Sequence, residues 1–328
     1  MLKSTKFILN RIHIGAIMDV LTDVLDNLLF HANFYFRTDL TLPWGIYVPP
    51  EKHVARFHIV TRGHGWIRVD GQATSVPIAN GDLVIVPHGA GHTIADDPST
   101  SPQALDDVLS EVSYTGVGPL VYGDGGPSTG LVCGEFSFDD AIHPLFTGLP
   151  PLLHITANAN RDKMWLDSTL RLISHEALAE QLGSLAIINR LAEIIFIQVV
   201  RSSANALESE IPFLAALADP QLNRALSAIH HQPSAQWSVE KLGHVAGMSR
   251  SSFSNRFSEL IRMTPHQYLT LVRMQHASRT LAKTDKPIIA VALSTGYKSE
   301  AAFSTAFKRH FGIRPGEYRR QHRTPQDG

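Results

Sequence analysis

Hydrophobic positions recur at helical spacing in the last third of the chain. Over residues 249–261 the apolar side chains Phe253, Phe257 and Leu260 fall four and three residues apart, on one face of a helix. The same spacing returns 50 residues later. The matched pairs are Ser249 and Ser299, Phe253 and Phe303, Phe257 and Phe307, Pro265 and Pro315, and Tyr268 and Tyr318. A repeat with this many matches predicts a duplicated supersecondary unit.

Capping residues and glycines predict that each copy is a helix-turn-helix unit. Ser238 can cap a short first helix, Gly247 supplies the turn, and Ser249 can cap the second helix. The segment 264–267, Thr-Pro-His-Gln, has the form of a capping box with proline at the first helical position. It predicts a helix ending near Lys283 that joins the two units.

The pattern between residues 34 and 132 is different, with short apolar runs separated by glycine, proline and aspartate. Segments 57–60, 65–69 and 83–86 are predicted strands, and Asp70-Gly71 favours a hairpin turn. Many short strands with such turns indicate a small β-barrel or sandwich. An amphipathic helix is expected before them, over 17–30.

Helices are predicted again after the Gly-Leu-Pro-Pro segment at 148–151. The first covers 166–182 and the second 185–201. The second carries an apolar stripe of Ile188, Leu191, Ile195 and Val199.

The predicted fold is therefore multidomain. Residues 1–150 form the strand-rich domain, 151–212 a helical segment and linker, and 213–328 an all-α domain that contains both helix-turn-helix units. Asp219-Pro220 is expected to cap and begin the first helix of that last domain.

Charge divides the chain in the same way. The net charge of the 328 residues is −1, but residues 221–328 hold 16 Lys and Arg against 6 Asp and Glu, and residues 1–220 hold 13 against 24. A basic half that also carries the repeat indicates that this half meets a polyanion. A single cysteine excludes an intramolecular disulfide, and the absence of a signal peptide or a long apolar run predicts a cytoplasmic protein without a membrane partner.

The second repeat resembles the DNA-binding domain of AraC/XylS-type bacterial transcription regulators. It runs Gly-Tyr-x-Ser-Glu-x-Ala-Phe-Ser-x-x-Phe-Lys-Arg from residue 296 and continues Phe-Gly-x-x-Pro-x-x-Tyr-Arg from residue 311. The resemblance implies a transcription regulator that binds double-stranded DNA, with activation more common than repression. It also implies RNA polymerase as a partner, a small-molecule effector, and a homodimer formed through the helical pair at 166–201. The apolar stripe of the second helix is expected at the dimer interface; the alternative is that it packs only within its own chain.

The resemblance also assigns DNA contacts. Two recognition helices about 34 Å apart would enter successive major grooves on one face of the duplex. Asn255 is the strongest reader, because an amide can bond bidentately to adenine. The base-contacting positions are Ser251, Ser254, Asn255, Glu300, Ala301, Ser304 and Thr305, and the phosphate-contacting positions are Arg250, Arg256, Lys298, Lys308 and Arg309.

The strand-rich domain resembles a cupin. Gly81, Pro87, Gly89 and His92 fit the second cupin motif, G-x5-P-x-G-x2-H. In cupin enzymes that histidine binds a metal with two more histidines and a glutamate. Here the first motif retains His58, whereas arginine stands at position 56 and Arg-Gly at 62–63, so two of the four ligands are missing.

Three residues remain candidates for an effector pocket or a metal site: His58, His92 and Cys133. His64, His88 and Cys133 could replace missing ligands, so zinc or another divalent metal is left open, with no cofactor certain. With or without a metal, an effector is expected to bind between the two histidines; the alternative is that they are hydrogen-bonded residues of the barrel. Without a role in binding, Cys133 packs in or beside a strand. The alternative to a regulator is a cupin metalloenzyme fused to a DNA-binding domain, which the incomplete ligand set disfavours; no enzyme activity is expected.

Overall fold

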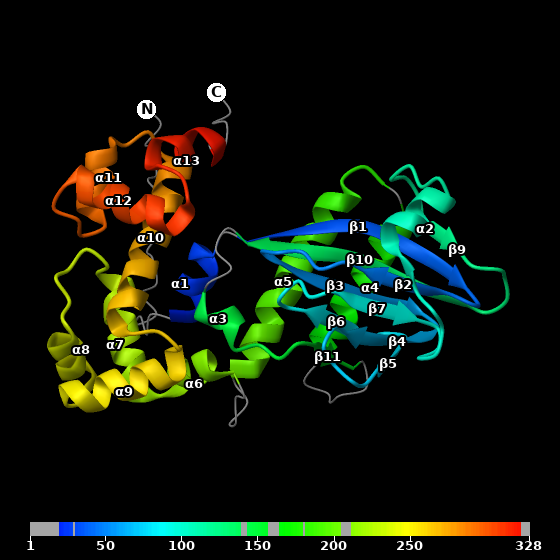
Figure 1. Ribbon diagram of the computed structural model, residues 1–328, viewed down its shortest axis with the longest axis horizontal. Coiled ribbons are helices and arrows are strands. Elements are labelled where there is room, and N and C mark those ends of the chain that lie inside the picture. The colour runs from blue at the N-terminus through cyan, green and yellow to red at the C-terminus, as the bar shows by residue number, and fades with distance from the viewer. Residues whose placement is uncertain are drawn as a thin grey trace, which may run out of the picture.

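A computed structural model describes residues 20–28, 30–138, 143–156, 164–179, 181–204 and 211–322. The molecule has a strand-rich N-terminal part and a helical C-terminal part at opposite ends (Figure 1). In the described part of the chain, no helix is long and apolar enough to cross a membrane.

The N-terminal part contains two sheets that face each other. One has the strand order β11-β6-β3-β10-β1-β9, and the other β5-β4-β7-β2-β8. The strands are β1 (Phe30–Thr41), β2 (Gly45–Val48), β3 (Val54–Arg62), β4 (His64–Val69), β5 (Val76–Ala79), β6 (Leu83–Val86), β7 (His92–Ala95), β8 (Gln103–Ala104), β9 (Leu120–Tyr122), β10 (Ser128–Phe138) and β11 (Leu153–Ile155).

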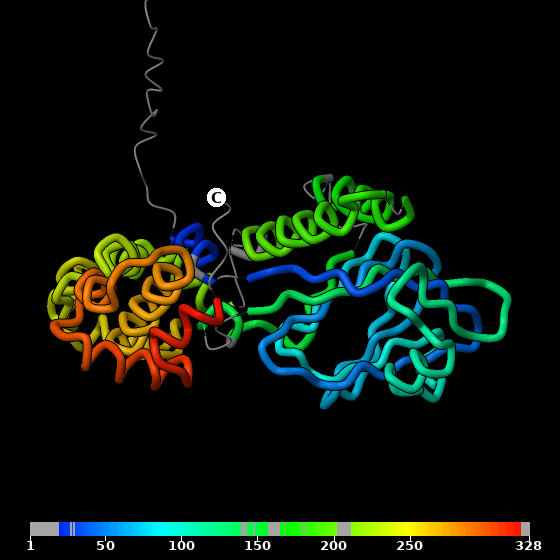
Figure 2. Tube along the Cα trace, turned by 90° about the horizontal axis from the view of Figure 1, so that it is seen from above, coloured from blue at the N-terminus to red at the C-terminus, as the bar shows by residue number. Residues whose placement is uncertain are grey.

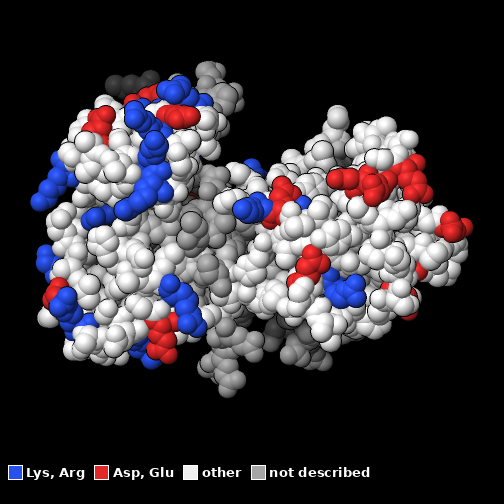
Figure 3. Space-filling view, viewed as in Figure 1, with Lys and Arg blue, Asp and Glu red and all other residues white. Residues whose placement is uncertain are grey.

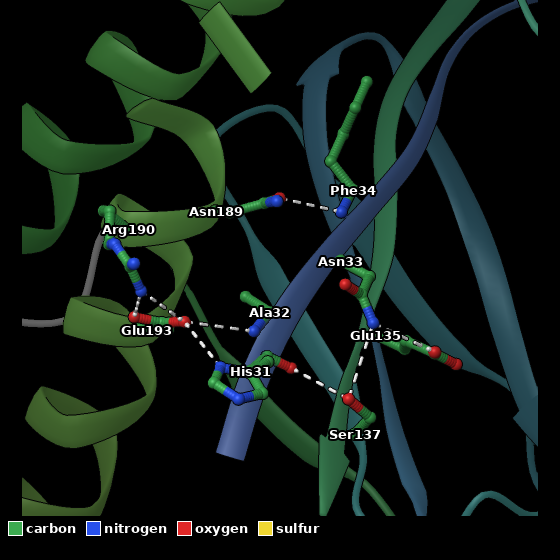
Figure 4. A network of polar contacts seen from close by, with 9 residues as sticks. All are labelled: His31, Ala32, Asn33, Phe34, Glu135, Ser137, Asn189, Arg190 and Glu193. Atoms are coloured by element: carbon green, nitrogen blue, oxygen red, sulfur yellow. Dashed lines mark hydrogen bonds and ion pairs between the residues drawn. The ribbon is translucent and has the colours of Figure 1, made fainter. Parts of the chain in front are cut away.

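The prediction of a β-barrel was wrong in one respect, because among the described residues both sheets remain open. The strands at their edges are β11 and β9 in one sheet and β5 and β8 in the other. Because β9 pairs only with residues 38–40 of β1, the earlier part of β1 has a free edge in the described structure, and side chains accept hydrogen bonds from its backbone there. The backbone N–H groups of Ala32 and Phe34 on β1 donate to Glu193 Oε1 at 3.4 Å and Asn189 Oδ1 at 2.9 Å (Figure 4).

Those two side chains belong to α5 (Ser184–Ala204), which packs on β1 beside α4 (Met164–Ala179). The two helices lie along the outer face of the six-stranded sheet (Figure 2). Helices, six-stranded sheet and five-stranded sheet therefore stack in three layers. The ring of Phe196 on α5 lies 5.1 Å from Phe136 and 5.9 Å from Phe138 on the sheet.

The predicted apolar stripe of α5 faces this sheet. Ile188, Ile195 and Val199 are buried within the single chain, and Leu191 is half-buried against the same core. The expectation that this stripe forms a dimer interface was wrong, because a helical period shows that a face is buried without showing what buries it.

Several short elements join the two parts. Helix α1 (Val20–Asn27) belongs to the N-terminal segment, yet it packs against α7 (Pro220–His231) and α10 (Pro265–Lys283) of the helical part. Helix α3 (Pro144–Thr147) contacts α6 (Pro212–Ala218), which in turn packs on α9 (Arg250–Ile261). Figure 1 shows α1 and α3 lying between the strands and the helical part.

The helical part contains both predicted helix-turn-helix units. The first consists of α8 (Val239–Ala246) and α9 (Arg250–Ile261), and the second of α11 (Ile288–Ser294) and α12 (Glu300–Phe311), with α13 (Pro315–His322) at the end. The predicted caps are confirmed: Ser238, Ser249 and Ser299 each accept a backbone N–H three residues on. Gly247 adopts a φ of 71°, and Thr264 and Gln267 form the capping box that opens α10.

Candidate DNA-reading helices and effector cavity

The two recognition helices expose the faces that the sequence assigns to DNA. On α9, Phe253 and Phe257 are completely buried and fix the helix to the core. On the other side Ser251 and Asn255 are exposed and Ser254 is half-exposed. These three side chains are therefore accessible to base edges in a groove.

The second recognition helix has a similar division. Phe303 and Phe307 of α12 are completely buried, whereas Glu300, Ala301 and Thr305 are exposed and Ser304 is half-exposed. A hollow on this surface is lined by Ser304, Thr305, Lys308, Arg309 and Arg314. Arg314 follows the end of α12, and the structure adds it to the basic residues that the sequence assigns to phosphate contacts.

The predicted phosphate contacts differ in their surroundings. Lys298, Lys308 and Arg309 are exposed. Arg250 Nε lies 2.7 Å from Glu240 Oε1, and Arg256 Nε lies 2.8 Å from Asp219 Oδ2. Asp219 caps α7, and its side chain is only 10% exposed. Burial alone would raise the pKa of this carboxyl, but the hydrogen bonds from Arg256 and from the backbone N–H groups of the cap lower it by more. Arg256 therefore ties α9 to α7 as well as being a candidate phosphate contact.

Two further arginines of this basic part have a structural role that the sequence did not reveal. Arg224 donates to the carbonyls of Val245 and Ala246 at the end of α8. Arg273 donates to the carbonyls of Pro233 and Ala235. Even so, blue side chains collect over the helical part and red ones over much of the strand-rich part, as the charge asymmetry predicts (Figure 3).

The second candidate site is a cavity of about 530 Å³ between the two sheets. Its position follows from strand alternation: Phe57 and Ile59 of β3 face α5, so Arg56, His58 and Val60 face the other sheet. Most of the wall is apolar. It includes Phe36 and Leu40 of β1, Ile46 of β2, Ile94 of β7 and Leu131 of β10.

The three sequence-predicted pocket residues form one hydrogen-bonded chain beside this cavity. Cys133 Sγ lies 3.1 Å from His58 Nδ1, and His58 Nε2 lies 2.8 Å from His92 Nε2. His92 Nδ1 lies 3.1 Å from the carbonyl oxygen of Ala90. His58 and Cys133 line the cavity, whereas His92 lies behind His58. The short contact leaves no room for an effector between the histidines, so a ligand would lie beside His58.

Burial keeps all three groups uncharged. Desolvation lowers the pKa of His58 well below its ordinary value and lowers the pKa of His92 to about 4, while it raises the pKa of the Cys133 thiol to about 12. Neutral rings then have one consistent arrangement: His92 Nδ1–H donates to Ala90, His58 Nε2–H donates to His92, and the Cys133 thiol donates to His58 Nδ1.

This arrangement does not fit a single metal ion. Cys133 and His92 contact opposite nitrogens of the same imidazole, so the three donors do not converge on one point. Of the substitutes considered from sequence, His64 is exposed and His88 Nε2 donates to the carbonyl of Leu149. Within the described ranges, no group of three or more His, Cys, Asp or Glu side chains is placed to hold a metal.

Arg56, which stands where cupins have a metal-binding histidine, makes a different contribution. Its Nη1 donates to the carbonyl of Pro49 at 3.0 Å, and its Nη2 forms an ion pair with Glu51. The side chain is 9% exposed and lines the cavity. In the sequence, position 56 is recognisable only as a missing metal ligand, and no motif marks Glu51 or Trp44, which also line the cavity.

Comparison with known proteins identifies both domains. A cupin family model matches residues 19–205, and a helix-turn-helix domain model matches residues 242–321. A putative AraC-like transcription regulator of Streptomyces antibioticus is 30% identical over 305 residues, 92% of this chain and 99% of its own. The chain belongs to the AraC-like transcription regulators.

Further similar proteins match either most of the chain or its helical part. The HTH-type transcriptional regulator AlkR of Acinetobacter baylyi is 30% identical over 308 residues, 93% of this chain and 100% of its own. Among solved structures, the DNA-binding domain of AdpA in complex with a target DNA is 34% identical, covering 31% of this chain and 92% of that one, with a TM-score of 0.30.

Proposed function

We propose that this AraC-like regulator is a cytoplasmic, homodimeric activator that recruits RNA polymerase when a small molecule occupies the cavity of its cupin domain. The observation that carries effector control is the continuous packing between that cavity and the first recognition helix. A ligand in the cavity can change the affinity for DNA only if it favours one conformation of the protein over another and the recognition helix differs between those conformations. Side chains that pack continuously between the two regions provide a route for this coupling.

The route begins at β10. Cys133 and Gly134 line the cavity, and two residues further the ring of Phe136 packs 5.1 Å from Phe196 of α5. Phe196 also lies 6.0 Å from Phe146 of α3. The strand and the helical layer therefore meet at α3.

From α3 the packing continues into the DNA-binding part. His143, which caps α3, is fully buried, and its ring lies 5.1 Å from Phe213 of α6 and 6.4 Å from Tyr268 of α10. Tyr268 lies 5.7 Å from Phe257 on the core face of α9. A shift of β10 therefore has a packed path to the first recognition helix.

Transcription in vitro tests this proposal. Sites are selected from random duplexes with the full chain, placed upstream of a promoter, and transcribed by RNA polymerase while neutral, anionic and cationic compounds are supplied in turn. We expect a compound that binds the cavity to increase transcription. Decreased transcription would make the protein a repressor, and no response to any bound compound would remove effector control.

The competing function, a cupin metalloenzyme, has weaker support because the histidine and thiol donors do not converge. A bound zinc or other divalent metal remains a prediction from the cupin resemblance. Metal analysis of the purified protein measures it directly, and a stoichiometric metal lost in the His92→Ala variant would revive the alternative.

A homodimer is supported by a second apolar face on the helical pair. Leu172 and Leu178 of α4 are 44% and 66% exposed, and Ile187 and Ile194 of α5 are 42% and 47% exposed. Ile187 and Ile194 are seven residues apart, so they lie on one side of α5, away from the sheet. Covering this face with a second copy would remove apolar surface from water.

A further inference from the structure

Two residues that line the cavity carry buried hydrogen-bond donors without partners in the described structure. Trp44 is 1% exposed, and its Nε1–H has no acceptor among the described residues. The Nε–H of Arg56, whose side chain is 91% buried, has none either, although its other nitrogens are bonded. Both residues line the cavity. Buried donors are normally satisfied, so each requires an explanation.

The two residues lie toward opposite ends of β2, which forms part of the cavity wall. Trp44 directly precedes β2, and Pro49, whose carbonyl accepts from Arg56, directly follows it. A strand rise of about 3.3 Å per residue separates these positions by roughly 16 Å. Between them the wall is formed by apolar side chains of β1, β2, β7 and β10. An elongated apolar molecule with hydrogen-bond acceptors would suit this arrangement.

The charges around the cavity disfavour an anion. Among the described lining residues, Arg56 supplies the positive charge, and it is already paired with Glu51. Asp106 adds a negative charge at the exposed start of α2 (Leu105–Glu111). Glu135, buried on β10 and paired in register with Arg56, adds another. A carboxylate ligand would have to be desolvated without a free cation to receive it.

A cation is disfavoured for a related reason. Glu51 already binds Arg56, and the buried unpartnered groups of the described lining residues are N–H donors, which a cationic headgroup cannot satisfy. Asp106, the other lining carboxylate among the described residues, is exposed at the start of α2, where solvent screens its charge. We propose that the effector is a neutral, elongated and mainly apolar molecule whose oxygen acceptor bonds to Trp44 Nε1–H or Arg56 Nε–H. This assignment rests on the proposed effector control and names the ligand class of that same cavity.

Binding to the full chain tests the assignment with four probes of matched length: methyl decanoate, decanoate, decylammonium and undecane. We expect methyl decanoate to bind at least about tenfold more tightly than either charged probe, because neither charge finds a free counter-ion in the buried part of the cavity. Tighter binding of decanoate or decylammonium overturns the neutral ligand and leaves effector control intact. Failure of all four probes to bind overturns the elongated apolar ligand class and leaves effector control to the transcription assay.

Two substitutions identify the groups responsible. Trp44→Phe removes the N–H and keeps most of the ring, so the affinity for methyl decanoate should fall about three- to tenfold while that for undecane is unchanged. Trp66→Phe is the matched control, since Trp66 is half-buried on β4 and does not line the cavity. If the Trp44→Phe variant binds the ester and undecane as tightly as the unaltered protein does, Trp44 is not a donor to the ligand.

A third variant should change which ligand charge the cavity prefers, instead of weakening binding. Glu51→Gln leaves the Arg56 charge without its partner, and Glu51 is 52% exposed, so the fold should tolerate the change. We expect decanoate to gain at least about tenfold in affinity relative to methyl decanoate. An unchanged ratio would show that the Arg56–Glu51 pair does not set the charge preference and would overturn the electrostatic part of the proposal.

Discussion

At the scale of single residues, exposed side chains on the recognition helices are expected to divide into readers and positioners. Asn255→Ala should cost roughly 1–3 kcal/mol on the preferred site and relax the base preference beneath α9. Arg309→Ala should weaken binding to all duplexes and reduce the salt slope by about one unit. Titrations against selected and scrambled duplexes at several salt concentrations measure both effects, and an identical sequence-independent loss would refute the division.

The buried histidines predict a second residue-scale effect, on stability. Because burial lowers the pKa of His58 and His92, the folded protein binds fewer protons below pH 6.5 than the unfolded chain does. The free energy of unfolding should therefore fall as the pH drops from about 6.5 toward 4, by up to about 1.4 kcal/mol per pH unit for each histidine.

Denaturant unfolding at several pH values measures this slope. His92→Gln removes one of the groups, so the fall between pH 6.5 and 5 should be shallower than in the unaltered protein. His64→Gln provides the control, because His64 is exposed on β4 and its replacement should leave the slope unchanged. A slope that both variants preserve would show that the Cys133–His58–His92 chain does not govern acid sensitivity.

At the scale of elements, the position of α5 on the open edge of β1 is expected to depend on a few directed bonds. Asn189→Ala removes the acceptor for the Phe34 N–H and leaves a part-buried donor unsatisfied, which should cost about 1–3 kcal/mol. Thermal or denaturant unfolding detects this loss. Ala186→Ser, an exposed change one turn earlier on α5, should be nearly neutral, and equal stability of the two variants would contradict the assigned role.

Elements whose information is local could be predicted from the sequence. The helix-turn-helix units follow from caps, glycine turns and aromatic spacing within about 20 residues, and the structure confirms them. The stripe on α5 was misassigned because its partner is β1, some 155 residues earlier. Trp44 directly precedes β2 and Arg56 lies on β3, so the two could not be placed in one cavity before the pairing of β2 with β7 and of β3 with β10 was known.

At the scale of the whole molecule, the exposed side of α4 and α5 is the surface proposed for dimerisation. Leu191→Glu would be a poor test of it, because Leu191 packs against the core of its own chain and the charge would destabilise the fold. Ile194, on the exposed side, can be changed without this penalty.

Ile194→Glu should convert the dimer to a monomer at micromolar concentration, since a charge in a covered apolar interface is costly unless it is paired. Sedimentation analysis gives the oligomeric state, and circular dichroism verifies that the variant is folded. Leu293→Glu is the matched control, because Leu293 is an exposed apolar residue of α11 at 56%. Loss of the dimer in both variants, or in neither, would place the interface elsewhere. A folded Ile194→Glu monomer should also bind paired DNA sites more weakly than the dimer while keeping its affinity for a single site, because linking two reading units raises the effective concentration of the second.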